Sequence, residues 1–404
     1  MNDILSENLT QDELDERYML RAIELAKRGA GRTNPNPMVG AVIVKDGAVI
    51  GEGYHERCGE LHAERNALAD CRARGHDPAG ATIYVTLEPC CHYGKTPPCT
   101  EALIEAQIAR VVIGSFDPNP KVAGKGTQIL RNAGIEVKEN VLRAECDAVN
   151  YVFLHYITTG TPYVILKYAM TADGKICTVS GKSRWVTGEK ARERTRRDRD
   201  RYAAIMVGIG TVLTDDPLLT CRVEGGRNPV RVICDSNLRI PRDAQIVRTA
   251  KDVPTILATA IEDEARLAPF RAAGCEIITV PRENFVAAGG GTVTDGVHAA
   301  GHAAPSGSID LKALMKALGE RQIDSVILEG GATLNAAALQ AGIVNRVQAY
   351  IAPKIFGGAA AKTPVAGPGV DSPAEAYLLG EPTVTCLDGD ILLESEVIRC
   401  SQES

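Results

Sequence analysis

Three short motifs constrain the fold most, because their chemistry requires them to meet although they lie far apart in the sequence. His62 and Glu64 open an expected helix, Cys90 ends an expected strand, and Cys99 starts the next expected helix. One imidazole and two thiolates suit a tetrahedral Zn²⁺ ion whose fourth position stays free for water. The sequence therefore predicts a metal centre built from His62, Cys90 and Cys99.

This donor set is typical of a hydrolytic metal site. A structural zinc ion is usually closed by four protein ligands, whereas a site that keeps a water ligand lowers the pKa of that water to near neutral. The carboxylate of Glu64, two residues from the histidine, can then move protons without binding the metal. The pattern indicates attack of water on an amidine-like ring carbon. It disfavours a regulatory or scaffolding protein in which zinc is only structural.

The spacing of the cysteines departs from the Cys-x-x-Cys pattern of zinc nucleobase deaminases. Eight residues separate Cys90 from Cys99, so Cys91 and His92 are rival ligands. We favour Cys90 and Cys99, because each directly follows a proline and a helix start at Cys99 favours its thiolate. The intervening segment is then free to hold a substrate.

Apolar periodicity predicts that the first half of the chain is an α/β domain. A helix over 15–29 precedes two β-prone runs over 39–44 and 49–54, which Asp46-Gly47 joins as a hairpin. The next expected elements are a helix over 62–74, a strand over 82–86, a helix from 100 and a strand over 110–114. Such alternation implies helices layered on a sheet.

The alternation restarts after a small polar turn at 158–162, and 404 residues exceed what one compact core usually holds. We therefore predict two α/β domains, over 1–158 and 159–404. The expected strands of the second domain lie at 163–170, 204–208, 230–234, 255–258, 276–280 and 325–329. Residues 287–308, rich in Gly, Ala, Ser and Thr, predict a flexible surface loop in which His298 and His302 are incidental.

Charge and hydropathy exclude two kinds of partner. A net charge of −6 and a pI near 5.8 argue against binding along a nucleic-acid backbone, which requires a basic face. No apolar run is long enough for a membrane span, and the polar first residues do not resemble a signal peptide. The 12 cysteines are scattered, which favours reduced thiols. We expect a cytoplasmic protein that binds small molecules, with no nucleic acid or membrane as partner.

The second domain carries a weaker signal for a ligand site. A buried strand runs into Gly330-Gly331 and then a helix, a junction that can expose backbone N–H groups to a phosphate. It lacks the Gly-x-Gly-x-x-Gly fingerprint of a Rossmann dinucleotide site. The mixed charges of 192–199 favour a solvated helix face, although one arginine there could meet a phosphate. Trp185, judged alone, is more often a core residue than a cofactor platform.

Several motifs resemble those of the bifunctional riboflavin-biosynthesis deaminase/reductase family. They are TNPNPMVG at 33–40, HAE at 62–64, TLEPCCHYGKTPPC at 86–99, DPNP at 117–120, LKYAMTADGK at 166–175, TVLTDDP at 211–217 and EGG at 329–331. The resemblance covers nearly the whole chain, and a long loop between the cysteines is typical of the family. It implies a cytidine deaminase-like three-layer N-terminal domain that deaminates a pyrimidine ribosyl phosphate. It also implies a dihydrofolate reductase-like C-terminal domain that uses NADPH to reduce the ribosyl group to ribityl.

The resemblance further implies individual site residues. In the first domain the substrate would contact Asn36, His55, His92, Lys95, Asp117 and Asn119, with Lys95 as the phosphate partner. In the second domain the substrate would contact Ser183, Arg199, Leu219, Arg222 and Glu329, the arginines through bidentate bonds to its phosphate. NADPH would contact Ala169, Trp185, Thr211, Asp215, Ser236, Gly331, Ala332, Thr333 and Leu334.

Opening the ribosylamine requires proton transfer, for which Lys167 and Glu329 are the candidates. The resemblance also favours a homo-oligomer, either a dimer or a tetramer. The competing hypothesis is a deaminase of another nucleobase or nucleotide fused to an inactive α/β domain, and the reductase motifs count against it.

Overall fold

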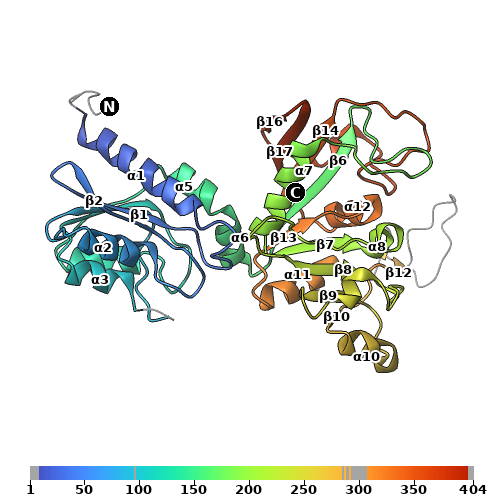
Figure 1. Ribbon diagram of the computed structural model, residues 1–404, viewed down its shortest axis with the longest axis horizontal. Coiled ribbons are helices and arrows are strands. Elements are labelled where there is room, and N and C mark those ends of the chain that lie inside the picture. Colours follow the sequence, from blue (N-terminus) through green and yellow to red (C-terminus); the bar gives the residue numbers. More distant parts are fainter. Residues whose placement is uncertain (1–8, 95–96, 284–285, 288–290, 293–306, 399–404) are drawn as a thin grey trace. The chain divides into compact units, whose positions relative to one another are not determined.

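The computed structural model describes residues 9–94, 97–283, 286–287, 291–292 and 307–398 (Figure 1). The chain forms two compact units, which divide between Gly160 and Thr161. In the described residues, no helix combines the length and apolar character needed to cross a membrane. The two units are described separately.

The first unit is a mixed sheet between two layers of helices (Figure 1). Its strands, in spatial order, are β2 (Ala48–Tyr54), β1 (Gly40–Lys45), β3 (Thr82–Leu87), β4 (Arg110–Ser115) and β5 (Glu136–Lys138). Its helices are α1 (Gln11–Lys27), α2 (Ala63–Ala73), α3 (Cys99–Glu105), α4 (Lys125–Asn132), α5 (Arg143–Val149) and α6 (Tyr151–Thr159). β1 is antiparallel to β2 and β3, whereas β3, β4 and β5 are parallel.

Alternating side chains on β1 bury both faces of this sheet. Val42 packs with α1, whereas Ile43 packs with α2 and α3 on the opposite face. The predicted hairpin is confirmed, because Asp46 and Gly47 have φ of 51° and 77°, as a type I′ turn requires. Gly53 on β2 lets α2 approach closely, since a Cβ there would lie 2.3 Å from the nitrogen of Ala67. This close approach fixes the start of α2, where the histidine motif lies.

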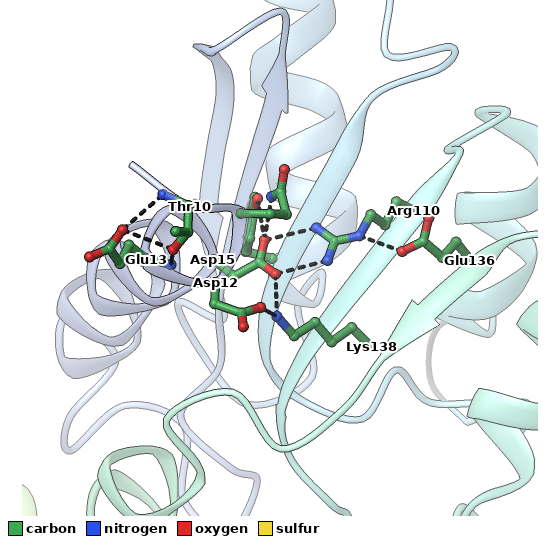
Figure 2. Close-up of polar contacts among 9 residues, drawn as sticks. Thr10, Asp12, Glu13, Asp15, Arg110, Glu136 and Lys138 are labelled. Atoms are coloured by element: carbon green, nitrogen blue, oxygen red, sulfur yellow. Dashed lines mark hydrogen bonds and ion pairs between the residues drawn. The ribbon is translucent and has the colours of Figure 1, made fainter. Parts of the chain in front are cut away.

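A buried carboxylate on α1 joins that helix to the sheet (Figure 2). Asp15 is fully buried and accepts hydrogen bonds from Arg110 of β4 at 2.8 Å and from Lys138 of β5 at 2.7 Å. The hydroxyl of Tyr84 also donates to it, at 3.0 Å. Burial alone would raise the pKa of Asp15, but the bonds from Arg110 and Lys138 outweigh it and hold the pKa well below its usual range.

We predict that Asp15→Asn destabilises the protein by about 3 kcal/mol at neutral pH, because it removes the buried anion that Arg110 and Lys138 share and leaves them only the exposed carboxylates of Glu136 and Asp12. The pKa of Asp15 is lower in the folded than in the unfolded chain, so the stabilisation is complete well above pH 4 and is lost as pH falls below about 4. Urea unfolding of wild type and variant at pH 7 and pH 3 measures both effects. A difference in stability that is the same at both pH values would contradict this assignment.

The second unit contains a longer mixed sheet (Figure 1). In spatial order its strands are β10 (Glu276–Thr279), β9 (Thr255–Thr259), β8 (Val230–Cys234), β7 (Ala204–Gly208), β13 (Ser325–Leu328), β6 (Tyr163–Thr171), β14 (Arg346–Ala352), β17 (Asp390–Ile398) and β15 (Leu378–Leu379), and β16 (Thr383–Leu387) also pairs with β17. Strands from β10 to β14 in this order are parallel, and β17 is antiparallel to β14.

Helices cover both faces of the parallel strands. They are α7 (Glu189–Arg201), α8 (Ile209–Asp215), α9 (Gln245–Arg248), α10 (Glu264–Ala272), α11 (Leu311–Glu320) and α12 (Ala332–Gln340), with a 3₁₀ turn at Pro373–Glu375. On one face Leu166 of β6 belongs to the same apolar cluster as Leu314 of α11. Because side chains alternate along a strand, the neighbouring Lys167 faces the other side, where Ala191 of α7 packs against Tyr350.

Several sequence expectations differ from the structure. α1 starts at Gln11, four residues earlier than expected, because Thr10 and Glu13 form a capping box. The expectation of a solvated face at 192–199 is wrong for Asp198, which is buried. Within 287–308, Ala287 belongs to the short pair β11 (Val286–Ala287) and β12 (Gly291–Thr292), which was not predicted. His298 and His302 lie outside the described residues.

Candidate functional site

The structure brings the three predicted metal ligands together in the first unit. His62 is the N-cap of α2, Cys90 follows β3, and Cys99 is the first residue of α3. His62 Nδ1 lies 3.4 Å from Cys90 Sγ and 3.5 Å from Cys99 Sγ. Bonds of about 2.3 Å to sulfur and about 2.0 Å to nitrogen at tetrahedral angles separate neighbouring ligand atoms by roughly 3.5 Å. The arrangement therefore fits Zn²⁺.

The two rival ligands do not join this cluster. Among the described residues, only His62, Cys90 and Cys99 form a metal-competent group of histidine, cysteine and acidic side chains. The Cys91 thiol instead donates to the carbonyl oxygen of Lys121, at 3.6 Å. Three ligands without a fourth from the described chain are typical of a catalytic zinc site, which leaves one position open.

Glu64 lies in the first turn of α2, two residues after His62, and only 3% of it is exposed. Burial raises its pKa, and the nearby charge of Cys90 raises it further. A carboxylate with a raised pKa accepts a proton more readily near neutral pH and returns it more readily to a leaving group. The environment of Glu64 thus suits a proton carrier.

His55 and Asn36 lie beside this centre. The rings of His55 and His62 are 5.2 Å apart, edge to face. When His55 Nδ1 donates to the carbonyl of Leu61, its Nε2 accepts from the amide of Asn36, at 3.3 Å. Burial lowers the pKa of His55, which favours this neutral form. In this arrangement both ring nitrogens of His55 and the amide nitrogen of Asn36 already have hydrogen-bond partners.

Asn150 holds the segment that carries Asn36. Its amide donates to the carbonyl of Met38 at 2.9 Å and accepts from the N–H of Met38 at 2.8 Å, so both polar atoms of a buried side chain bind one backbone position. Sequence reasoning missed Asn150, because 112 residues separate it from Met38 and no motif contains it.

The remaining candidate residues of this unit follow the carboxyl ends of β3 and β4. These strands are parallel and adjacent, so their carboxyl ends share one edge. Asp117 is buried there, its Oδ1 accepts from the N–H of Asn119, and burial raises the pKa of Asp117 to about 6. His92 Nδ1 is buried without a hydrogen-bond partner in the described chain, as expected of an atom that awaits a ligand. Lys95 lies outside the described residues.

Glu88 is a buried carboxylate beside the metal ligands that sequence reasoning did not single out. It accepts hydrogen bonds from the N–H groups of Gly124 and Thr127, at 3.0 and 3.2 Å, and so fixes the start of α4. A Cβ on Gly126 would lie 2.3 Å from the carbonyl oxygen of Pro89, which leaves room only for glycine. The sequence signal that could have identified Glu88 is its place directly before Pro89 and the metal ligand Cys90.

A second polar cluster lies on the α7 face of the second unit. Arg199 of α7 donates from Nε and Nη2 of its guanidinium to the two oxygens of Glu329, at 2.8 and 2.9 Å, and Lys167 Nζ lies 3.8 Å from the same carboxylate. Burial opposes ionisation of Glu329, but Arg199 and Lys167 outweigh it and hold the pKa to about 2. Burial lowers the pKa of Lys167. The cluster combines a fixed anion with an ammonium that gives up its proton easily.

The geometry differs from the expectation that Arg199 binds a phosphate through its fork, because Glu329 already occupies that fork and Thr220 O accepts from its Nη1 at 3.1 Å. Leu219 and Arg222 flank Thr220 in left-handed conformations, with φ of 54° and 57°. Leu219 is buried and Arg222 is exposed, so within this loop Arg222 has the freer side chain. Ser183 is also exposed.

The expected cofactor residues gather along one edge of the sheet. Ser236 follows β8, Thr211 lies in α8 after β7, and Gly331 follows β13, while Ala169 lies in β6. These four strands are adjacent and parallel, so their carboxyl ends share an edge, where α/β sheets bind ligands.

Near the same edge Gly331 caps α12 without a side-chain hydrogen bond, and a Cβ there would lie 3.9 Å from Thr211 Oγ1. Ala332, Thr333 and Leu334 form the first turn of α12, and Asp215 ends α8. The junction therefore offers backbone N–H groups that an anionic cofactor can use.

Trp185 is not a core residue, so that interpretation of the sequence was wrong. The residue is 65% exposed and has a φ of 67°. Lys354, two residues beyond β14, donates to the carbonyls of Trp185 and Val186 at 2.8 and 2.7 Å, and the Arg192 guanidinium lies 4.1 Å from the ring centroid. An exposed indole held this way offers a face for stacking.

Comparison with known proteins agrees with this geometry. Residues 12–115 match the model of the cytidine and deoxycytidylate deaminase zinc-binding region, and residues 162–388 match the RibD C-terminal domain. The chain is 50% identical to the riboflavin biosynthesis protein RibD of Actinobacillus pleuropneumoniae over 96% of both chains. It is 40% identical to that of Escherichia coli strain K12, over 85% of this chain and 89% of the relative.

Solved structures give the same result over nearly the full length. Acinetobacter baumannii RibD superposes with a TM-score of 0.81 at 37% identity, covering 96% of this chain and 100% of that one. A diaminohydroxyphosphoribosylaminopyrimidine deaminase/5-amino-6-(5-phosphoribosylamino)uracil reductase from Thermotoga maritima gives 0.79 at 38% identity, with the same coverage. These matches confirm the predicted fold class, a deaminase-like α/β unit followed by a reductase unit.

Proposed function

The chain belongs to the bifunctional RibD family of riboflavin-biosynthesis deaminase/reductases, and we propose which of its residues carry each of the two reactions. The first unit deaminates 2,5-diamino-6-(5-phosphoribosylamino)pyrimidin-4(3H)-one, and the second reduces the ribosyl group of the resulting aminouracil to ribityl. The observation that carries the assignment is that one chain holds both the three-ligand centre beside Glu64 and the partly buried Lys167–Glu329–Arg199 cluster.

In the first unit His62, Cys90 and Cys99 would hold Zn²⁺, which when bound makes a water molecule acidic near neutral pH. Glu64 takes a proton from the attacking water and gives it to the departing amino group. A carbon–oxygen bond forms at the ring carbon, the carbon–nitrogen bond breaks, and ammonia leaves. Asn36, His55, His92, Asp117 and Asn119 orient the pyrimidine, and Lys95 binds the phosphate.

In the second unit NADPH would supply the hydride that reduces C1 of the sugar. Lys167, whose pKa is lowered by burial, gives a proton to the ring oxygen as the sugar opens. Glu329 keeps the ammonium in place from 3.8 Å. Arg199 orients Glu329, and Arg222 with Ser183 binds the phosphate end of the substrate, since the fork of Arg199 is already engaged.

The cofactor lies along the carboxyl edge of β8, β7, β13 and β6. Its phosphates meet the uncapped start of α12 at Gly331 to Leu334, and its polar groups meet Thr211, Asp215 and Ser236. Ala169 and the exposed face of Trp185 contact its rings. The protein acts in the cytoplasm as a homo-oligomer on small molecules, without a nucleic acid or membrane partner.

We predict that the purified protein releases ammonia and then oxidises NADPH when the diaminopyrimidine ribosyl phosphate is added. Ammonia release should stop when a chelator removes Zn²⁺, while NADPH oxidation should continue on the aminouracil intermediate supplied directly. Because Trp185 is the only tryptophan of the chain, its emission should be quenched by energy transfer to bound NADPH, and Trp185→Phe should abolish that signal. Zinc-loaded protein that releases ammonia without oxidising NADPH would contradict the assignment of the second unit.

A further inference from the structure

Arg231 of β8 is a buried cation without an anionic partner. It is fully buried, and in the described part of the chain no carboxylate forms an ion pair with it. Its guanidinium donates to neutral oxygens only: Thr255 Oγ1, Thr249 Oγ1, and the carbonyls of Leu218, Ile246, Thr249 and Val253. Burial of a charged side chain is unfavourable unless other interactions compensate for it, so the contacts of Arg231 must account for its place in the core.

One of these bonds reaches the loop that leads into the reductase cluster. Arg231 Nη1 donates to Leu218 O at 3.3 Å, and two residues later Thr220 O accepts from Arg199 at 3.1 Å. Arg199 in turn holds Glu329. Arg231 and the carboxylate beside Lys167 are therefore linked by hydrogen bonds at both ends of the covalent backbone of residues 218–220.

The backbone of this loop requires external support. Asp216, Leu219 and Arg222 all have left-handed φ, at 38°, 54° and 57°. Aspartate tolerates this conformation, but leucine and arginine adopt it rarely and at a cost in backbone strain. Gln245 supplies part of the support, since its N–H donates to Asp216 Oδ1 at 2.8 Å and its amide to Asp216 O at 2.6 Å. Arg231 supports the middle of the same loop.

We propose that Arg231 is a positioning residue for the reductase reaction, which fixes the conformation of residues 216–222 and through them the placement of Arg199 and Glu329. Burial lowers the pKa of Arg231 to about 10, which still leaves it charged at neutral pH and able to polarise the carbonyls that it binds. The proposal rests on the reductase site described above. It assigns Arg231 an indirect role, in which the residue contacts neither substrate nor cofactor.

The test compares three variants of the full chain. Arg231→Lys keeps the charge but loses the planar fork. Gln245→Ala removes the side-chain bond to Asp216 O, keeps the backbone bond to Asp216 Oδ1, and does not alter the buried cation. Thr255→Val is the matched control, because it removes a partner of Arg231 on the side away from the loop. For each variant, the measurements are backbone hydrogen exchange over 216–222, the reductase KM for the aminouracil intermediate, kcat, and the thermal midpoint.

We expect Arg231→Lys and Gln245→Ala to speed exchange in the loop, to raise KM roughly tenfold because the loop carries Arg222, and to lower kcat roughly tenfold because the loop positions Arg199 and Glu329. Thr255→Val should lower the thermal midpoint and leave loop exchange and KM unchanged. If Arg231→Lys does not fold, Gln245→Ala carries the test. Unchanged KM and loop exchange in both variants would overturn the proposal, as would an equal effect of Thr255→Val. If Glu329 also proves dispensable for reduction, the assigned reductase site fails rather than this inference.

Discussion

Replacing Glu64 by Gln is expected to lower the rate of ammonia release by roughly a thousandfold, within the range for loss of a general acid–base group. Glutamine keeps the size of the side chain and can still form hydrogen bonds, but it cannot take a proton from water and return it to the leaving amino group. The metal ligands His62, Cys90 and Cys99 are not altered, so zinc content should equal that of wild type.

The comparison needs a carboxylate of the same unit that is outside the site. Glu52 of β2 is ion-paired with Arg21 at 2.7 Å, and Glu52→Gln removes a charge without approaching the metal centre. Ammonia release is measured for both variants, together with zinc content and NADPH oxidation on the aminouracil intermediate. Near wild-type deamination by zinc-loaded Glu64→Gln would show that another group moves the proton.

The metal centre was accessible to sequence reasoning because its chemistry is local. His62 and Glu64 lie at the start of one helix, Cys90 follows a proline after a strand, and Cys99 follows a proline at a helix start, so residue type and local position identified them. The choice of Cys99 over Cys91 rested on the expected helix start, and the structure places Cys99 at the first position of α3. The parallel strands at 204–208 and 230–234 were similarly clear, because strands buried on both faces are continuously apolar.

The features of the second unit that the sequence did not predict depend on contacts between residues far apart in the chain. Trp185 is exposed and has a left-handed backbone, and its carbonyl oxygen accepts a hydrogen bond from Lys354, 169 residues later. The fork of Arg199 is engaged by Glu329, 130 residues away. Contacts between residues so far apart in the sequence leave no local sequence pattern that could predict them. The antiparallel strands β16 and β17 are different, since Asp388-Gly389 joins them with the hairpin signal that identified Asp46-Gly47, and that signal was overlooked.

Glu329→Gln is expected to lower the reductase kcat by roughly a hundredfold or more, while ammonia release continues and the aminouracil intermediate accumulates. The substitution removes the anion that both Arg199 and Lys167 face inside the protein. Without it the two partly buried cations repel each other and Lys167 loses its ordered position. The pKa of Lys167 falls further, because Glu329 no longer opposes the effect of burial. Protonation of the sugar's ring oxygen then becomes limiting.

Glu396→Gln is the matched control for this variant. Glu396 lies in β17 of the same unit, accepts a hydrogen bond from Tyr163, and is 2.5 Å from Arg346, so the change removes a paired carboxylate elsewhere on the sheet. Quenching of Trp185 emission by NADPH reports whether the cofactor site is intact in each variant. If Glu329→Gln binds NADPH and still reduces the intermediate at the wild-type rate, the carboxylate only stabilises the fold. Loss of reduction with retained quenching would instead show that Glu329 and Lys167 act after the cofactor is bound, in the opening of the sugar.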